Sequence, residues 1–273
     1  SMTATPIPRT LALTMYGDLD LSLLDEMPVG RKPVLTTVVS PANRAGVYEA
    51  IRAQLREGRQ LYIICPRIAE ADPSILGSLQ AKSVTEEAKR IQKAVFPEFS
   101  IGTLHSKMTK EKKEAAMSDF VNHKTDILVA TSVIEVGINV PNATIIIIEG
   151  AERFGLAQLH QLRGRVARSS IQAHCYLFAD AKTEKTAERL RLFTKAKNGF
   201  ELAEYDLALR GTGELSGLKQ WGVSDLAMDS LKNIKLVEAA REEAKKLLAQ
   251  DTTLSKYPLL QVAIKKTENM HFE

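Results

Sequence analysis

The chain has 273 residues, of which 44% are hydrophobic and 26% are charged, proportions that are ordinary for a globular protein. Its formal net charge of +4 permits binding to nucleic acid without requiring it, so basic residues would have to cluster to matter. No hydrophobic run approaches the roughly 20 residues that span a bilayer, and the N-terminus lacks the pattern of a secretory signal. Cys65 and Cys175 lie in apolar runs, so we expect buried, reduced thiols and a cytoplasmic protein.

The N-terminal segment, residues 1–32, has the character of a connection between domains. Its leading Ser-Met is interpreted as a cloning remnant, which implies that the natural protein continues upstream. The stretch LSLLDEMP (21–28) resembles a strand that ends in a magnesium-binding Asp-Glu pair. No phosphate-binding loop of the pattern G-x-x-x-x-G-K-[ST] occurs in the chain, so Asp25 and Glu26 are interpreted as charges of the connecting segment.

From residue 33 to residue 180, short apolar runs alternate with helical patterns. The runs are rich in β-branched residues and apolar on both faces, as parallel strands buried between helices are. The predicted strands are 33–40, 61–66, 100–106, 126–132, 144–150 and 173–179, and the predicted helices are 42–58, 84–96 and 109–123, the last with Thr109 as its N-cap. This alternation predicts an α/β fold, a parallel sheet sandwiched by helices, with functional residues after the carboxyl ends of the strands.

The remaining segments have different patterns. Residues 66–83 lack a clear period, which predicts a long surface loop. Two helical patterns separated by Asn198-Gly199 predict a helical hairpin, and a glycine-rich loop follows it. A helix within 224–251 and a short helix after Pro258 complete the chain. We therefore divide the chain into a connecting segment, an α/β lobe, a hairpin with its loop and a C-terminal helical region, at residues 1–32, 33–180, 181–222 and 223–273.

The segment QLHQLRGRVARS (158–169) brings three arginines close together. Residues 157–163 have a helical pattern, so Arg165 and Arg168, three positions apart, could present planar donors on one face to a phosphate. A guanidinium beside a γ-phosphate can stabilise the transition state of phosphoryl transfer. Arg163 is expected to anchor the turn or the neighbouring hairpin. By itself, the cluster is equally typical of a solvated, basic helix end.

A second motif, DILVATSVIEVGINVP (126–141), ends a buried strand in hydroxyl residues and continues to a Gly, an Asn and a Pro. Such a loop brings polar groups to one edge of the sheet, although a plain strand-to-helix connection is the alternative. Together with QLRGRVAR (161–168), the pattern resembles motifs V and VI of superfamily-2 helicases. TATP (3–6), LYIICPRI (61–68) and GTLHSKM (102–108) resemble motif III, motif IV and an element that contacts the nucleic-acid backbone. The resemblance implies a complete second RecA-like lobe, with the first lobe largely missing.

This resemblance assigns roles to individual residues. Arg165 and Arg168 are the implied catalytic residues, which sense the γ-phosphate. Asn139 stands where helicases often have Asp, but its amide can still bind a ribose hydroxyl. His105 is as often structural at a strand end. The implied nucleotide-binding residues are Gly137, Asn139 and Gln161, and the implied nucleic-acid contacts are His105, Ser106, Lys107 and Thr131.

Two further stretches resemble the RecG family of branch-migrating DNA helicases. YGDLDLSLLDEMPVGRKPV (16–34) is similar to the linker between its two lobes, and NGFELAEYDLALRGTGELSGLKQWG (198–222) is similar to its translocation motif. The chain departs from the usual loop at Thr212, Lys219 and Trp221, the last of which is expected to pack between the hairpin and the lobe. The residues implied to couple ATP turnover to movement on duplex DNA are Arg210, Glu214 and Gln220.

The resemblance implies the C-terminal motor lobe of an ATP-dependent double-stranded DNA translocase. Its implied activity is to remodel stalled forks and branch-migrate Holliday junctions in the bacterial cytoplasm, at the nucleoid. ATP with Mg²⁺ would be bound mainly by the missing lobe, and branched DNA, that lobe and a wedge domain would be the partners. The histidines show no metal-binding spacing, so we expect no bound metal. The chain alone is expected to be inactive.

Two other interpretations remain open. An Mfd-like, transcription-coupled translocase shares the translocation motif and would reveal itself by binding RNA polymerase. A non-enzymatic interaction module could retain a RecA-like lobe only as a scaffold, which the absence of a phosphate-binding loop favours at face value. The presence of a phosphate-binding loop and a wedge domain upstream would eliminate the scaffold.

Overall fold

The computed structural model describes two separate units of the chain. The residues it describes are 30–66, 83–131, 140–166, 169–196, 198–199, 201–202, 205 and 234–268, with the backbone alone at 234–238, 241 and 265–268. Described residues up to Leu202 belong to one compact unit, and those from Tyr205 onward belong to the second. The sequence-based division at residues 32, 180 and 222 stays a prediction.

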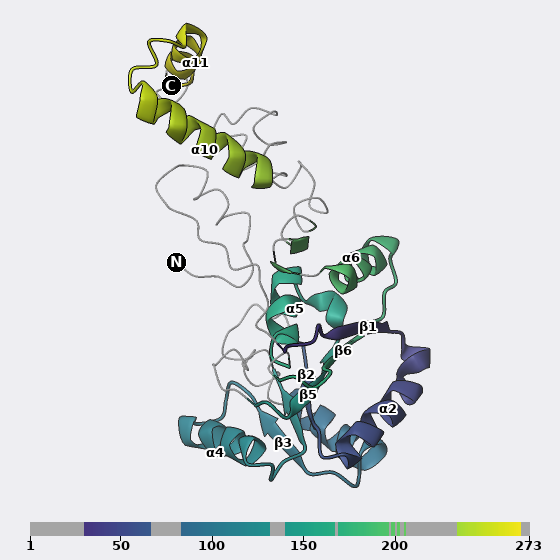
Figure 1. The fold of residues 1–273 in the computed structure, drawn as a ribbon. Coiled ribbons are helices and arrows are strands. Elements are labelled where there is room, and N and C mark those ends of the chain that lie inside the picture. Colours follow the sequence, from purple (N-terminus) through teal and green to yellow (C-terminus); the bar gives the residue numbers. More distant parts are fainter. Residues whose placement is uncertain are drawn as a thin grey trace. The chain divides into compact units, whose positions relative to one another are not determined.

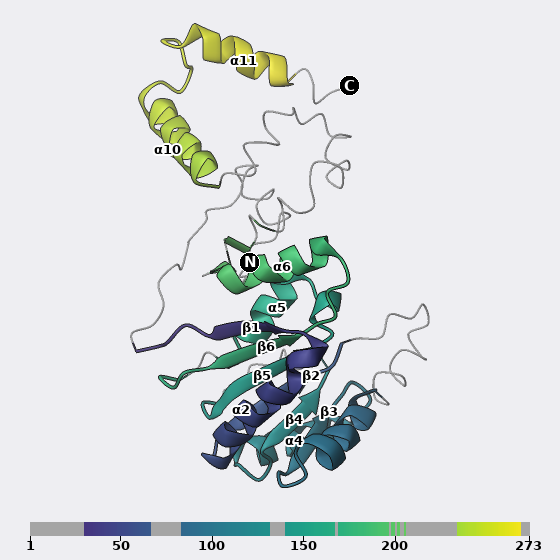
Figure 2. The same cartoon turned by 90° about the vertical axis from the view of Figure 1, so that its right-hand side faces the viewer.

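A six-stranded parallel sheet forms the centre of the first unit (Figures 1 and 2). The strand order is β1-β6-β5-β2-β4-β3, and all five neighbouring pairs are parallel. All six predicted strands are confirmed: β1 (Leu35–Val39), β2 (Gln60–Ile64), β3 (Ile101–Leu104), β4 (Ile127–Ala130), β5 (Ala143–Glu149) and β6 (His174–Phe178). Because the strands are parallel, their carboxyl ends lie at one edge of the sheet, which we call the carboxyl edge.

One face of the sheet is covered by two helices. After the 3₁₀ turn η1 (Pro41–Asn43), α2 (Arg44–Arg56) crosses this face, and Figure 2 shows it in front of the strands. Beside it, the helix of residues 83–90 continues into a π-helical turn, η2 (Ile91–Val95). Tyr48 of α2 packs edge-on against Phe96 and Phe178, with ring centroids 5.7 and 5.5 Å apart. This aromatic contact joins both helices to the sheet.

The opposite face is covered by α4 (Lys110–Val121), α5 (Leu156–Arg163) and α6 (Glu184–Lys195). The connections through α4 and α5 cross the sheet in the reverse direction, and right-handed crossovers therefore place these helices on the other face. The Tyr62 and Phe120 rings, 4.9 Å apart, join α4 to β2. Leu159 of α5 and Phe193 of α6 are fully buried. The helical sandwich predicted from the sequence is confirmed.

The starts of several helices follow their sequence signals. The Thr109 hydroxyl accepts a hydrogen bond from the Lys112 amide at 3.4 Å, which confirms the predicted N-cap of α4. The Asn198 side chain accepts one from the Glu201 amide at 2.9 Å, so a new turn begins at the predicted break. These caps use up backbone donors that helix ends otherwise leave unpaired.

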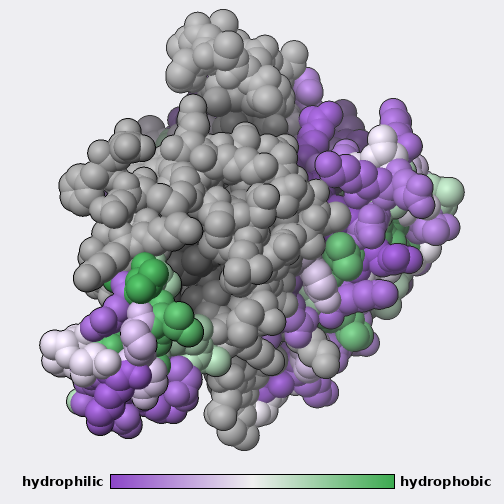
Figure 3. All heavy atoms as spheres, turned by 90° about the horizontal axis from the view of Figure 1, so that it is seen from above, coloured by the Kyte–Doolittle hydropathy of each residue, from purple (hydrophilic) through white to green (hydrophobic). Residues whose placement is uncertain are grey.

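The second unit contains α10 (Ile234–Gln250) and α11 (Pro258–Glu268), in agreement with the predicted helix within 224–251 and the predicted helix after Pro258. Between them, the Asp251 carboxylate accepts hydrogen bonds from the Thr253 amide and the Lys256 amide, at 3.2 and 2.9 Å. Hydrophobic residues gather on this helical pair, at the lower left of Figure 3. Those with exposed side chains are Leu248, Leu259, Leu260, Val262 and Ile264. No helix in the described ranges is long and apolar enough to cross a membrane.

Candidate nucleotide and nucleic-acid site

The carboxyl edge gathers buried polar atoms that lack hydrogen-bond partners. Seven buried side-chain nitrogen or oxygen atoms make no hydrogen bond within the described part of the chain. Five of the seven lie at this edge or directly beyond it: Arg44 Nε, His105 Nδ1, Thr131 Oγ1, Glu149 Oε1 and Glu152 Oε2. An unpaired buried polar atom costs about 1–3 kcal/mol. Their concentration at one edge makes this edge the candidate place for a bound ligand.

The turn after β3 presents the first group of predicted nucleic-acid contacts. His105 is half-buried, whereas Ser106 and Lys107 are exposed. The turn is held by the Met108 amide, which donates to the His105 carbonyl at 3.2 Å, and by the Lys113 ammonium, which donates to the Ser106 carbonyl at 3.1 Å. Burial, and secondarily the charge of Lys113, lower the pKa of His105, so its ring is neutral at pH 7. The exposed Ser106 and Lys107 are thus held at the edge on a fixed turn.

The end of β4 lies directly beside the end of β3. The Thr131 amide donates to the Leu104 carbonyl at 3.3 Å, so Thr131 and His105 follow neighbouring strand ends. The Thr131 side chain is 1% exposed, and its contact with a nucleic-acid backbone stays a prediction. The following residues 132–139, with Gly137 and Asn139, lie outside the described residues.

Helix α5 carries the predicted nucleotide-facing residues. Its buried leucines, Leu156, Leu159 and Leu162, pack on the sheet, which leaves Gln161 exposed. The helix ends at Arg163, and the chain continues in tighter turns, in which the Arg165 amide donates to the Leu162 carbonyl at 3.0 Å. Arg165 is therefore half-buried in a turn beyond the helix. Arg168 lies outside the described residues, so the shared face predicted for the two arginines stays a prediction, as do the roles of Arg210, Glu214 and Gln220.

Arg163 is a buried charged residue that ties α5 to α6. Its guanidinium donates to the carbonyls of Phe193 and Ala196, both at 3.3 Å, and lies 4.6 Å from the centre of the Phe193 ring. It also donates to His160 Nδ1 at 3.1 Å. Burial and the charge of Arg163 lower the pKa of His160 to about 4, which keeps that nitrogen an acceptor. The anchoring role predicted for Arg163 is confirmed, because α6 leads directly to the break at Asn198.

Sequence reasoning missed a charged cluster at the same edge. Glu149, at the end of β5, lies 3.3 Å from the Arg44 guanidinium and 3.8 Å from the Arg90 guanidinium. Arg90 is paired in turn with Glu87 at 2.6 Å. The one available signal is a carboxylate that ends an otherwise apolar strand run, TIIIIEG. Its two partners are far away in the sequence and could not be inferred from it.

The described residues fit a contributing part of a nucleotide site. Gln161 offers an exposed amide and Arg165 a guanidinium one turn later, whereas a phosphate-binding loop is absent from the sequence. Across the described ranges, no group of three His, Cys, Asp or Glu side chains is arranged to hold a metal ion. Burial raises the pKa of both Cys65 and Cys175 to about 12, so neither thiol is a ready nucleophile.

Comparison with known proteins assigns both halves of the chain. Residues 46–170 match the family model of the helicase conserved C-terminal domain, and residues 196–271 match that of ATP-dependent DNA helicase RecG, domain 3, C-terminal. The ATP-dependent DNA helicase RecG of Synechocystis sp. is 46% identical over 265 residues, which cover 97% of this chain and 31% of that relative. The Thermotoga maritima RecG is 48% identical over 248 residues, 90% of this chain and 31% of that relative.

This chain belongs to the RecG family. A solved structure of RecG bound to a three-way DNA junction matches 87% of this chain and 30% of that chain, with a TM-score of 0.65 and 44% identity. The chain thus spans about a third of the length of the curated RecG relatives that it matches. Strands β2 to β5 and helix α5 fall in the region that matches the helicase domain, whereas α10 and α11 fall in the RecG-specific region. Arg163 links the two regions, because its acceptor Ala196 is the first residue of the RecG-specific match.

Proposed function

We propose that this chain is the C-terminal motor lobe and coupling region of an ATP-dependent double-stranded DNA translocase. The intact protein would remodel stalled replication forks and branch-migrate Holliday junctions in the bacterial cytoplasm, at the nucleoid. The observation that carries the proposal is the 46% identity to a RecG helicase over nearly the whole chain. The hydrogen bonds of Arg163 support it, since they join the helicase lobe to the start of the RecG-specific region.

The proposed mechanism divides the lobe between two ligands. ATP with Mg²⁺ would supply the energy of hydrolysis and would be held mainly by another part of the intact protein. From this chain, Arg165 and Arg168 would stabilise charge on the γ-phosphate, with Gly137, Asn139 and Gln161 nearby. Exposed Ser106 and Lys107, on their fixed turn, would contact the phosphate backbone of DNA. Rotation of the lobe would then be transmitted to duplex DNA through the hairpin and its loop, by Arg210, Glu214 and Gln220.

The experiment that tests this proposal uses the intact protein with Arg168→Ala. We expect DNA-stimulated ATP hydrolysis to fall by about a thousandfold, the lower end of the effect of an arginine finger, with fork binding nearly unchanged. Arg191→Ala, an exposed arginine on α6, is the matched control and should leave both activities intact. Normal turnover in Arg168→Ala would refute the assignment of the finger. A protein that binds forks without hydrolysing ATP would favour the scaffold interpretation, and one that binds RNA polymerase would favour a transcription-coupled translocase.

A further inference from the structure

The charged cluster joins two helices on one face of the sheet to the strand end that leads into α5, the helix to which the proposed function assigns nucleotide contacts. Glu149 ends β5, which leads into the 3₁₀ turn η4 (Ala151–Arg153) and then into α5, the nucleotide-facing helix. Arg44 begins α2, and Arg90 ends the helix of residues 83–90. Both helices cover the other face of the sheet, and the start of α2 directly follows the carboxyl end of β1 and the turn η1.

One partly buried carboxylate lies beside guanidinium groups from both helices. The Glu149 side chain is 14% exposed and lies 3.3 Å from Arg44 and 3.8 Å from Arg90. Arg44 is itself fixed by its position 4.8 Å from the centre of the Phe178 ring. Arg90 donates to the Tyr48 hydroxyl at 3.2 Å, in addition to its pair with a carboxylate of its own helix. Each guanidinium is thus oriented by a second contact, so its position relative to Glu149 is defined.

The charges of this cluster act on the position of the end of β5. Burial raises the pKa of Glu149, and the charges of Arg44 and Arg90 counteract that shift. An ion pair that is only partly buried contributes little net stability, because solvent screens the attraction, but it disfavours arrangements in which the partners separate. The cluster therefore defines where the end of β5 lies relative to the two helices, and it does little else for stability.

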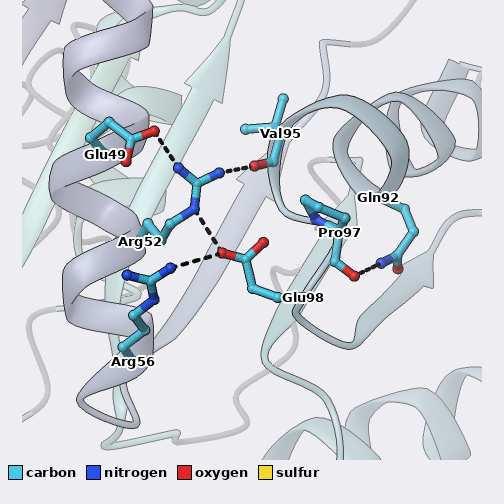
Figure 4. Close-up of polar contacts among 7 residues, drawn as sticks. All are labelled: Glu49, Arg52, Arg56, Gln92, Val95, Pro97 and Glu98. Atoms are coloured by element: carbon cyan, nitrogen blue, oxygen red, sulfur yellow. Dashed lines mark hydrogen bonds and ion pairs between the residues drawn. The ribbon is translucent and has the colours of Figure 1, made fainter.

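The same two helices are also joined by a second cluster that leaves the sheet out. At the opposite edge, Arg52 of α2 donates to Glu98 at 2.7 Å and to the carbonyl of Val95, and Arg56 lies 3.6 Å from Glu98 (Figure 4). This second cluster holds α2 to the segment after η2 without contacting β5. A comparison of the two clusters therefore isolates what Glu149 adds, which is a link between these helices and β5.

The segment that connects Glu149 to α5 is conformationally restricted. Gly150 adopts a left-handed φ of 58°, and a Cβ at this position would lie 3.3 Å from the Pro66 ring. The following turn is fixed to α6, because Arg189 donates to the Glu152 carbonyl. A displacement of Glu149 is therefore passed to α5 and not absorbed by a loose connection.

We propose that Glu149 is a positioning residue that couples the DNA-facing edge of the lobe to the nucleotide-facing helix α5. The inference rests on the proposed function and adds a route for the stimulation of ATP hydrolysis by DNA. DNA bound at the carboxyl edge shifts α2 and the helix of residues 83–90, the ion pairs carry the shift to the end of β5, and α5 moves with it. Such coupling requires contiguous packed elements, which these contacts provide.

The test uses the intact protein with Glu149→Gln, which keeps the shape of the side chain and removes its charge. We expect the stimulation of ATP hydrolysis by fork DNA to fall about tenfold, within the range of coupling changes seen for such networks. The affinity for fork DNA, measured by fluorescence anisotropy, should stay within about twofold, because in this proposal Glu149 does not bind DNA itself. A twofold change in affinity is a small change in binding free energy. Glu98→Gln is the matched control, because it removes a carboxylate that joins the same helices without contacting β5, and it should leave the stimulation unchanged.

A second variant keeps the inference testable if Glu149→Gln does not fold. Arg90→Gln removes one arm of the cluster from a side chain that is 43% exposed, and it should show the same loss of stimulation. Stimulation in Glu149→Gln or Arg90→Gln equal to that of Glu98→Gln would overturn the inference. A loss of DNA affinity in proportion to the loss of turnover would also overturn it, because the arginines would then bind DNA directly. Absence of DNA-stimulated hydrolysis in the unsubstituted protein would refute the proposed function itself, and this inference with it.

Discussion

Arg163 shows how a single buried charge can define the relation between two helices. Its guanidinium donates to two carbonyls at the end of α6 and lies over the Phe193 ring. Few other positions of α6 would preserve these contacts. Its anchoring role could be anticipated from its place in the motif, at the end of the predicted helix 157–163. The role of Glu149 could not, since its partners lie on other elements far along the chain.

We expect Arg163→Met to lower the free energy of unfolding of the lobe by about 2–4 kcal/mol. The substitution leaves two buried carbonyls without a donor, and each costs about 1–3 kcal/mol. Urea denaturation of this chain, monitored by circular dichroism, measures the change. Arg191→Met, at an exposed position on α6, should change the free energy of unfolding by less than about 0.5 kcal/mol. Equal effects of the two substitutions would contradict the anchoring role of Arg163.

His160 makes the stability of the lobe depend on pH. The pKa of His160 is about 4 in the folded chain and about 6.5 when unfolded, so between these values the unfolded state binds the proton preferentially. Stability should therefore decline as the pH falls from 6.5 to 4, by up to about 3 kcal/mol from this residue. Unfolding curves measured across this range should be less pH-dependent in His160→Gln. An unchanged pH dependence in that variant would show that His160 is not buried beside Arg163.

At the scale of elements, the strands and helices of the lobe were predictable because their patterns are local. Short apolar runs marked each strand, and a Thr marked the start of α4. The π-helical turn at Ile91–Val95 was not predictable, because the sequence there continues an ordinary helical pattern. Its geometry involves Arg52, a residue of another helix, whose guanidinium reaches the Val95 carbonyl (Figure 4). Local patterns predict elements, whereas contacts between elements decide such irregularities.

Two glycines in different backbone conformations should respond to substitution with opposite signs. Gly150→Ala places a Cβ at a left-handed φ and against Pro66, and should destabilise the lobe by about 1–2 kcal/mol. Gly46→Ala, inside α2 with open space around it, should stabilise the lobe by about 0.5–1 kcal/mol. Thermal unfolding of both variants measures the difference. Destabilisation by Gly46→Ala or neutrality of Gly150→Ala would contradict the turn and helix geometry described above.

At the scale of the whole molecule, the chain combines a helicase lobe with a RecG-specific region. The α/β sandwich and the family were predictable, because the order of several motifs along the chain is more specific than any one of them. The individual roles of Arg168, Asn139 and Gln220 follow from resemblance alone, since these residues lie outside the described part of the chain. What the described residues add is a physical connection between α5 and the start of the RecG-specific region.

The most direct test of the proposed function is the number of ATP molecules that the intact protein would hydrolyse for each fork that it reverses. It should be measured for the unsubstituted protein and for Arg163→Lys, which keeps the buried charge but cannot donate through a planar fork to both carbonyls. We expect fork reversal in Arg163→Lys to fall at least about tenfold further than ATP hydrolysis, if the α5–α6 link transmits the motion at a coupling free energy of about 1–2 kcal/mol. A parallel fall in both activities, with the ratio unchanged, would contradict the proposal that rotation of the lobe reaches the DNA through the hairpin, to which Arg163 joins α5.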